Sequence, residues 1–169
     1  MMPKIGGQTL WLLLSVAVLL LDQLTKFWAS AALNYADPVA VMPFFNLTLL
    51  HNPGAAFSFL ADAGGWQRWL FVLLAITIVV ALTIWLLRLR ADERWTAFAL
   101  AMIIGGAVGN LVDRLLHGYV VDFLDFHVGG YHWPAFNIAD AAITVGVGIL
   151  LISSFRSETP SATEQKHQP

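Results

Sequence analysis

The chain has 169 residues, of which 58% are hydrophobic and only 12% are charged, with a formal net charge of −2. This composition indicates a membrane protein with room for one compact domain, and the lack of a basic excess argues against a nucleic-acid partner. The sequence holds no cysteine, which excludes a disulfide, a thiolate nucleophile, a cysteine-containing zinc site and lipidation of this chain on its own cysteine.

Four apolar segments predict an all-α polytopic membrane protein with four transmembrane helices. They lie at about residues 10–28, 69–87, 95–112 and 133–155. Each can cross a hydrocarbon core of about 30 Å at about 1.5 Å per residue. We expect one membrane domain over residues 1–156, with outer loops at 30–67 and 117–131 and a polar cytoplasmic tail at 157–169.

The first segment has a second interpretation. Lys4, the apolar run after it and the small residues Ala29-Ser30-Ala31 also fit a cleaved secretory signal. Asp22 and Lys26 inside the would-be cleavage region disfavour this alternative, and the later spans keep the same topology in either case.

Basic residues gather on one side of the predicted spans. The loops at 30–67 and 117–131 contain no Lys or Arg. The positive-inside rule therefore places both termini in the cytoplasm and both longer loops outside. The basic residues that set this orientation are Lys4, Arg88, Arg90, Arg94, Arg156 and Lys166.

The outer loops carry signals of their own. Alternating apolar residues predict strands at 39–41 and 45–49, followed by a turn at Asn52-Pro53-Gly54 and another short strand at 55–60. We therefore expect a small extracytoplasmic β-sheet. The apolar stretch 120–128 is expected to lie in the membrane interface as a loop or helix.

Polar residues inside the spans predict ties between helices. Asp22 and Lys26 are four residues apart, which favours an ion pair on one helix face. Asn110, Asp113 and Arg114 lie at the outer end of the third span. The glycines at 105, 106 and 109 have a spacing that lets helices approach closely.

Asp122 and Asp140 stand beside or within apolar stretches, where a central aspartate costs about 2.5–3.5 kcal/mol. Asp140 lies seven residues after Trp133, about 10 Å along a helix, which is deep for a simple helix cap. Paired carboxylates indicate acid/base hydrolysis. Spacing alone leaves Asp125 as a rival to Asp122. The irregularly spaced histidines 117, 127 and 132 are expected to be solvated loop residues.

Five short blocks carry a resemblance to a known family. They are Asp22-Gln23-Leu24-Thr25-Lys26, Asn52-Pro53-Gly54-Ala55-Ala56-Phe57-Ser58, Gly105-Gly106-Ala107-Val108-Gly109-Asn110-Leu111-Val112-Asp113-Arg114, Val120-Val121-Asp122-Phe123 and Phe136-Asn137-Ile138-Ala139-Asp140. In this order and at this spacing they resemble the bacterial lipoprotein signal peptidases, also called signal peptidase II, over nearly the whole chain. Pro53 departs from the Thr that is common in the family, but a turn accommodates proline, so we expect activity to survive.

The resemblance implies an intramembrane aspartyl endopeptidase of the bacterial inner membrane, with its active site near the extracytoplasmic face. Such an enzyme removes the signal peptide from a prolipoprotein, before the diacylglyceryl-modified cysteine, by means of a water molecule that two aspartates activate. The implied partners are this substrate and membrane lipid, and the implied state is a monomer without metal or cofactor.

The resemblance also selects residues. It makes Asp122 and Asp140 catalytic, and so prefers Asp122 to Asp125. It assigns substrate binding or support of the catalytic pair to Asn52, Gly54, Asn110, Arg114 and Asn137. It leaves Asp22, Lys26 and Asp113 as structural polar residues.

Two other classes of protein remain as alternatives. A small proton-coupled carrier would use Asp22, Lys26 and Asp140 as an intramembrane relay, but four spans are few for a carrier and no inverted repeat is visible. An assembly or scaffold protein would use its polar residues only to tie helices, and would tolerate Asp→Asn changes at positions 122 and 140. Among proteases, a GxGD-type aspartyl enzyme is disfavoured because residues 118–122 lack that motif.

Overall fold

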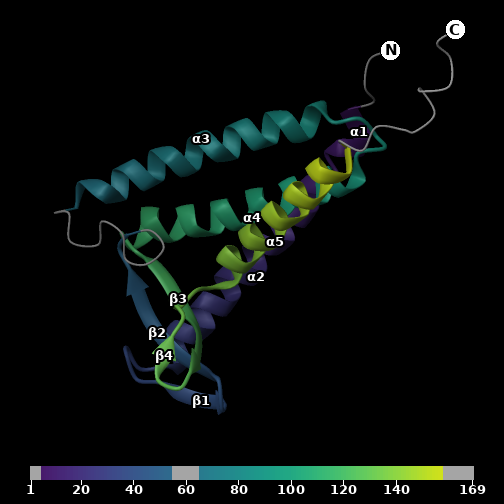
Figure 1. Ribbon diagram of the computed structural model, residues 1–169. Coiled ribbons are helices and arrows are strands. Elements are labelled where there is room, and N and C mark those ends of the chain that lie inside the picture. Colours follow the sequence, from purple (N-terminus) through teal and green to yellow (C-terminus); the bar gives the residue numbers. More distant parts are fainter. Residues whose placement is uncertain (1–4, 55–64, 158–169) are drawn as a thin grey trace, which may run out of the picture.

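The computed structural model describes residues 5–54 and 65–157. The elements in chain order are α1 (Ile5–Gln8), α2 (Trp11–Ala32), β1 (Val39–Met42), β2 (Phe45–Asn52), α3 (Trp66–Arg88), α4 (Arg94–Leu116), β3 (Val120–Val128), β4 (Tyr131–His132) and α5 (Ile138–Ser157). The long helices lie together and the strands gather at one end of them (Figure 1).

The four predicted spans are confirmed as α2, α3, α4 and α5, each long and apolar enough to cross a membrane. Their ends differ from the prediction. α4 continues past Asp113 to Leu116, because backbone hydrogen bonding does not stop where the apolar run stops. The largest difference is in the fourth span, where the helix begins at Ile138 rather than at residue 133.

α4 is the central helix and packs against α2, α3 and α5 (Figure 1). Glycines permit this close approach. A Cβ on Gly106 would overlap the backbone oxygen of Ala139, and a Cβ on Gly109 would overlap the Asp22 carboxylate. The predicted glycine spacing therefore serves contacts with two helices at once, α5 and α2.

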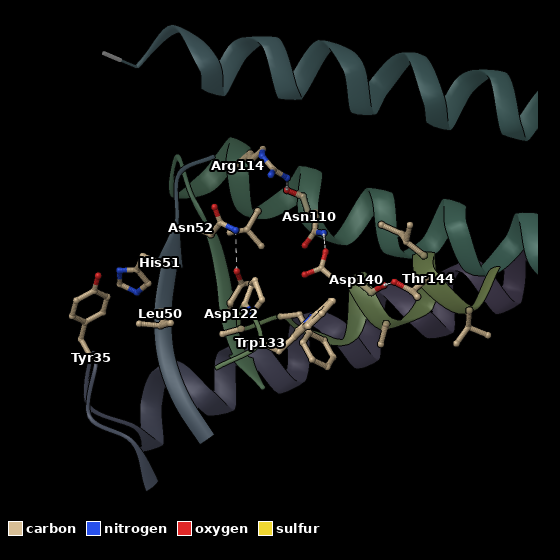
Figure 2. Close-up of a pocket in the computed structure, with 17 residues that line it drawn as sticks. Tyr35, Leu50, His51, Asn52, Asn110, Arg114, Asp122, Trp133, Asp140 and Thr144 are labelled. Carbon is tan, nitrogen blue, oxygen red and sulfur yellow. Dashed lines mark hydrogen bonds between the residues drawn. The ribbon is translucent and has the colours of Figure 1, made fainter. Parts of the chain in front are cut away.

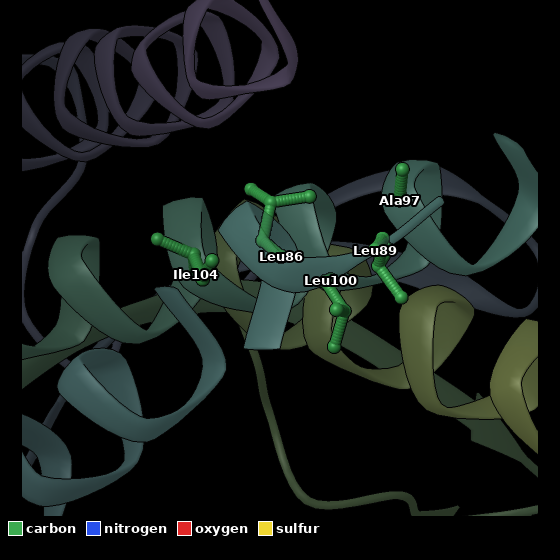
Figure 3. Packing of buried hydrophobic residues seen from close by; sticks show 5 residues of the cluster. All are labelled: Leu86, Leu89, Ala97, Leu100 and Ile104. Carbon is green, nitrogen blue, oxygen red and sulfur yellow. The ribbon is translucent and has the colours of Figure 1, made fainter. Parts of the chain in front are cut away.

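An apolar cluster fastens α3 and the loop after it to α4. It consists of Leu86, Leu89, Ala97, Leu100 and Ile104 (Figure 3). Leu86 is 0% exposed, whereas Leu73 on the same helix is 64% exposed. The outward side of α3 is thus left to the bilayer. The C-terminal end of α3 is held by a few buried side chains.

We expect Leu86→Ala to lower the free energy of unfolding by about 2–5 kcal/mol, because it removes buried atoms and leaves a cavity. Leu73→Ala is the matched control on the same helix and should change stability little, since its side chain faces outward. Thermal unfolding of the two purified variants in one detergent measures the difference. Equal stabilities would contradict this account of the core.

The sheet is antiparallel with strand order β1-β2-β3-β4. β2 pairs with β3 so that Leu50 lies opposite Asp122 and Asn52 lies opposite Val120, and a register shift separates this part of the ladder from Leu47. Such a shift bends a strand and redirects its side chains. The sheet therefore presents the end of β2 beside Asp122.

The strands predicted at 39–41 and 45–49 are confirmed as β1 and β2. Residues 120–128, expected as an interfacial loop or helix, form strand β3, because their backbone groups pair with β2. The strand predicted at 55–60 lies outside the described residues.

The end of the helices opposite the sheet carries the connection between α3 and α4 (Figure 1). This connection holds Arg88, Arg90 and Arg94 at or next to the helix ends. Gln8, the last residue of α1, donates from Nε2 to the backbone oxygen of Arg90 at 2.8 Å. The arginines that set the predicted orientation thus lie at the end away from the sheet.

Candidate active site

An extended segment, residues 133–137, leads from the sheet to α5. The N–H groups of Phe123 and Leu124 donate to the Phe136 oxygen at 3.1 and 2.9 Å, and the Phe136 N–H donates to the Leu124 oxygen at 3.1 Å. The expectation of a helix from residue 133 was wrong, because this pairing and Pro134 keep the backbone extended. As a result α5 starts beside β3.

Asn137 caps the N-terminus of α5. Its Oδ1 accepts a hydrogen bond from the Asp140 N–H at 2.9 Å, the arrangement that Asn favours before a first helical turn. Asp140 therefore lies in the first turn of α5, less deep in the helix than its distance from Trp133 had predicted. The positive end of the helix dipole favours a carboxylate at this position.

Asp122 lies in β3 and is 3% exposed. Its Oδ1 accepts from Asn137 Nδ2 at 2.7 Å, and its Oδ2 accepts from Asn52 Nδ2 at 3.1 Å. Asn137 thus contacts both aspartates, one through its amide nitrogen and the other through its amide oxygen. The two acids that the sequence singled out are joined by a single side chain.

Asp122 and Asp140 line one cavity of about 890 Å³, into which their carboxylates project from β3 and from α5 (Figure 2). The part next to the carboxylates is polar and the wall along α5 is largely apolar. The other lining residues are Tyr35, Leu50, His51, Asn52, Asn110, Arg114, Val120, Trp133, Pro134, Ala135, Phe136, Ala141, Ile143, Thr144 and Val145. A concave, largely apolar cavity with a few polar groups is typical of a ligand or substrate site.

Burial raises the pKa of Asp122 to about 7, and the nearby Asp140 carboxylate adds to this effect. Hydrogen bonds from Asn52 and Asn137 act in the opposite direction, because they stabilise the ionised form. A carboxyl group that titrates near neutral pH is well suited to exchange protons with a reacting group.

Asp125 does not line this cavity. Alternation along β3 places it on the face opposite Asp122, where its carboxylate is bonded by His132 Nδ1 at 2.7 Å, Thr48 Oγ1 at 2.9 Å and Asn46 Nδ2 at 3.3 Å. Burial opposes ionisation, but these hydrogen bonds hold the pKa of Asp125 below its ordinary value. His132 is exposed, as expected, but it lies in strand β4 and bonds Asp125.

Asn110 and Arg114 face the cavity one turn apart on α4 (Figure 2). Asn110 Nδ2 donates to Asp140 Oδ1 at 2.7 Å. Arg114 Nη2 donates to the backbone oxygen of Gly54 at 2.9 Å, and its buried Nε has no hydrogen-bond partner within the described ranges. Gly54 thus contributes through its backbone oxygen.

A second polar group lies behind the cavity. The predicted pair of Asp22 and Lys26 is confirmed at 2.9 Å, and Asp113 lies 3.0 Å from the same ammonium. All three side chains are buried and none of them lines the cavity. They tie α2 to α4, whereas the spacing of Asp22 and Lys26 predicted only the ion pair within one helix.

The sequence did not reveal the aromatic contacts of His51, which lines the cavity together with Tyr35. His51 stacks on Tyr119 with ring centroids 4.1 Å apart and also contacts Tyr35 at 4.9 Å. Burial and the neighbouring His117 hold the pKa of His51 below its ordinary value. These residues lie far apart in the sequence, so their contact could be predicted only from the register in which the strands pair.

Comparison with known proteins shows the family of the chain. A family model described as signal peptidase (SPase) II matches residues 14–156. The lipoprotein signal peptidase of Paraburkholderia phymatum is 51% identical over 154 residues, which are 91% of this chain and 92% of the relative. That of Acinetobacter baumannii is 56% identical over 146 residues, 86% of this chain and 83% of the relative.

A solved structure, described as a bacterial membrane enzyme studied by the in meso method, has a similar fold. It superposes with a TM-score of 0.81 at 32% identity, over 99% of this chain and 97% of its own. The range that the family model matches, residues 14–156, contains the sheet, both aspartates and nearly all of α2, α3, α4 and α5. The chain belongs to the signal peptidase II family.

Proposed function

We propose that this chain cleaves prolipoproteins immediately before their diacylglyceryl-modified cysteine, with Asp122 and Asp140 as the catalytic pair. At the coarser level, its family makes it a multi-pass inner-membrane protease that removes signal peptides from prolipoproteins. The finer assignment rests on one observation, that two carboxylates from different elements meet in a single cavity.

The proposed chemistry needs one proton on the pair. Two nearby carboxylates do not readily ionise together, so they share a proton at working pH. The ionised member takes a proton from a water molecule, whose oxygen bonds to the scissile carbonyl carbon while the protonated member donates to the carbonyl oxygen. The C–N bond of the tetrahedral intermediate then breaks. The leaving amine receives the proton that was taken from water, and the carbonyl proton returns to the pair. Which aspartate acts as base is not assigned, because the titration belongs to the pair.

Neighbouring amides support this chemistry. Asn52 and Asn137 orient Asp122, and Asn110 orients Asp140, each through a direct hydrogen bond. Arg114 lines the cavity. We assign to Arg114 the binding of a backbone oxygen of the substrate, with Gly54 setting the position of its guanidinium.

The membrane location follows from the chemistry of the substrate. Burial of acyl CH₂ groups contributes about 0.8 kcal/mol each, so a peptide with two acyl chains stays in the bilayer and the protease must meet it there. The apolar wall along α5 then receives the signal segment, and the sheet clamps the scissile region. Cleavage that survives deletion of the outer loop containing residues 52–57, which includes the end of β2, would contradict the clamp.

The proposed orientation places both termini in the cytoplasm and the sheet outside. It rests on the arginines at the α3–α4 connection and on the absence of Lys and Arg from residues 30–67 and 117–131. The cavity lies at the sheet end of the helices, near the extracytoplasmic face in this orientation. We propose that a monomer is active, since both aspartates and their partners come from one chain.

Purified protein incubated with a synthetic diacylglyceryl-modified prolipoprotein tests this function. Mass spectrometry should show one cut, immediately before the modified cysteine. The same peptide without its acyl chains is the control and should be cleaved far more slowly. Absence of cleavage in both detergent and lipid vesicles would overturn the proposal, and proteoliposomes that transport protons without cutting would favour a carrier.

The upper limb of the pH profile should move when Asn52 is changed. Its hydrogen bond stabilises the ionised form of Asp122, so Asn52→Ala should raise the pKa of this carboxyl beyond about 7. Since the rate falls when the shared proton is lost, the loss of kcat/KM should then begin at a higher pH.

Asn46→Ala is the matched control for this change. Asn46 lies on the same strand and bonds Asp125 instead, so its removal should leave the limb in place. Rates measured across the neutral range separate the two variants. If the pH at which kcat/KM falls is unchanged in Asn52→Ala, Asp122 does not hold the proton that the reaction needs.

A further inference from the structure

The ammonium of Lys26 lies in the interior, 3% exposed, with all of its donors engaged. Lys26 Nζ is 2.9 Å from Asp22 Oδ2 and 3.0 Å from Asp113 Oδ2, and it donates to Asn110 Oδ1 at 2.9 Å. An ammonium has three N–H groups, so these three acceptors occupy it completely. Lys26 has no donor left for water or substrate.

The two carboxylates that Lys26 holds have parallel roles. Asp22 Oδ1 accepts from the backbone N–H of Ala139 at 2.9 Å. Asp113 Oδ2 accepts from the backbone N–H of Val121 at 3.0 Å. Ala139 immediately precedes Asp140 and Val121 immediately precedes Asp122, so each carboxylate fixes the backbone next to one member of the pair.

The third acceptor leads to the pair through a side chain. Asn110 takes a hydrogen from Lys26 at its Oδ1 and donates from Nδ2 to Asp140 Oδ1 at 2.7 Å. Asn137 donates to the same Asn110 oxygen at 3.3 Å and to Asp122 at 2.7 Å. All three bonds of the ammonium therefore end within one or two contacts of a catalytic carboxylate.

Burial of ions is by itself a weak source of stability, because desolvation opposes the attraction. Geometry is the better reason for this group. The two aspartates lie on separate elements, β3 and α5. Lys26 bonds the side chains that hold both of them, Asp22, Asp113 and Asn110. We infer that Lys26 is a positioning residue, whose ammonium fixes the spacing of the Asp122 and Asp140 carboxylates, an inference that rests on the proposed function.

Lys26→Met tests this inference, because methionine keeps much of the length and lacks the donors. We expect kcat to fall by about 100-fold, the size of effect that a displacement of about 1 Å produces, while KM changes less than about threefold. KM should hold because Lys26 does not line the cavity. The assay is cleavage of the synthetic modified prolipoprotein by purified, folded protein.

Ser15→Ala is the matched control. Ser15 is a buried residue of the same helix, and its Oγ donates to the Ala101 oxygen of α4 at 2.9 Å. It also ties α2 to α4, but among the described residues no hydrogen bond leads from it to either aspartate. Ser15→Ala should lower thermal stability and keep kcat. A kcat loss of equal size in both variants, or wild-type kcat in folded Lys26→Met, would overturn the inference.

Two further variants complete the test. Because the bonds act as a unit, Asp22→Asn combined with Lys26→Met should lose no more kcat than Lys26→Met alone, and additive losses would contradict the inference. If Lys26→Met does not fold, Lys26→Arg decides. Its planar guanidinium keeps the charge but not the three donor directions, so reduced kcat at unchanged KM supports positioning and wild-type kcat refutes it.

Asp122→Asn in the same assay separates the two levels of failure. If the wild-type protein does not cleave, or if Asp122→Asn cleaves normally, the proposed function itself is wrong. If the wild-type protein cleaves, Asp122→Asn does not and Lys26→Met keeps wild-type kcat, then only the positioning role of Lys26 is wrong.

Discussion

Replacement of either aspartate by asparagine should lower cleavage of the modified prolipoprotein by about 10²- to 10⁴-fold or more, the contribution typical of acid/base groups. Asparagine has nearly the shape of aspartate but neither takes up nor releases the proton that the reaction moves. Asp122→Asn and Asp140→Asn should therefore fold normally and bind substrate. The measurement is single-turnover cleavage, with substrate binding measured separately.

Asp125→Asn is the control for this experiment. Asp125 lies in the same strand as Asp122 and is also buried, but it is bonded by His132, Thr48 and Asn46 on the other face. Its replacement should leave the rate within a few-fold of wild type. Normal cleavage by Asp122→Asn and Asp140→Asn would instead favour the scaffold alternative.

A single methyl group at position 106 of α4 should lower activity by displacing α5, the helix that carries Asp140. The Cβ in Gly106→Ala would overlap the backbone oxygen of Ala139, the residue that precedes Asp140. We expect a loss of about 1–3 kcal/mol of stability, as for other overpacked sites. We also expect a fall in kcat on the order of 100-fold, because α5 must shift and carry Asp140 with it.

Gly148→Ala provides the comparison. Gly148 lies within α5, and a Cβ there would meet nothing within 4 Å. Alanine is the better helix former, so this variant should gain about 0.5–1 kcal/mol and keep full activity. Thermal unfolding and cleavage rates of the two variants give both quantities. Full activity in Gly106→Ala would mean that α4 and α5 can separate without harm to the site.

The sequence predicted the parts of this molecule that depend on local pattern. Apolar runs predicted the four spans, alternation predicted β1 and β2, and the spacing of Asp22 and Lys26 predicted their ion pair. Each of these features follows from residues that are neighbours along one helix or strand. The resemblance, rather than the pattern, selected Asp122 over Asp125.

Features that depend on contacts between distant segments were not predictable in this way. The start of α5 was misplaced because the pairing of Phe136 with Leu124 overrides the apolar character of residues 133–137. The nature of residues 120–128 was missed because a strand buried on both faces has no alternation to read. The central position of Lys26 emerged only when α2, α4, β3 and α5 were seen together.

Because Phe136 pairs with Leu124, the distance between Asp122 and Asp140 does not depend on the number of residues in the hairpin between them. Residues 129 and 130 form the hairpin tip, where both glycines have positive φ and a Cβ would meet nothing within 4 Å. The tip lies outside the residue pairs that align β3 with residues 131–136. Extra residues inserted there, such as an epitope that reports membrane sidedness, would lengthen the hairpin and leave the chemistry in place.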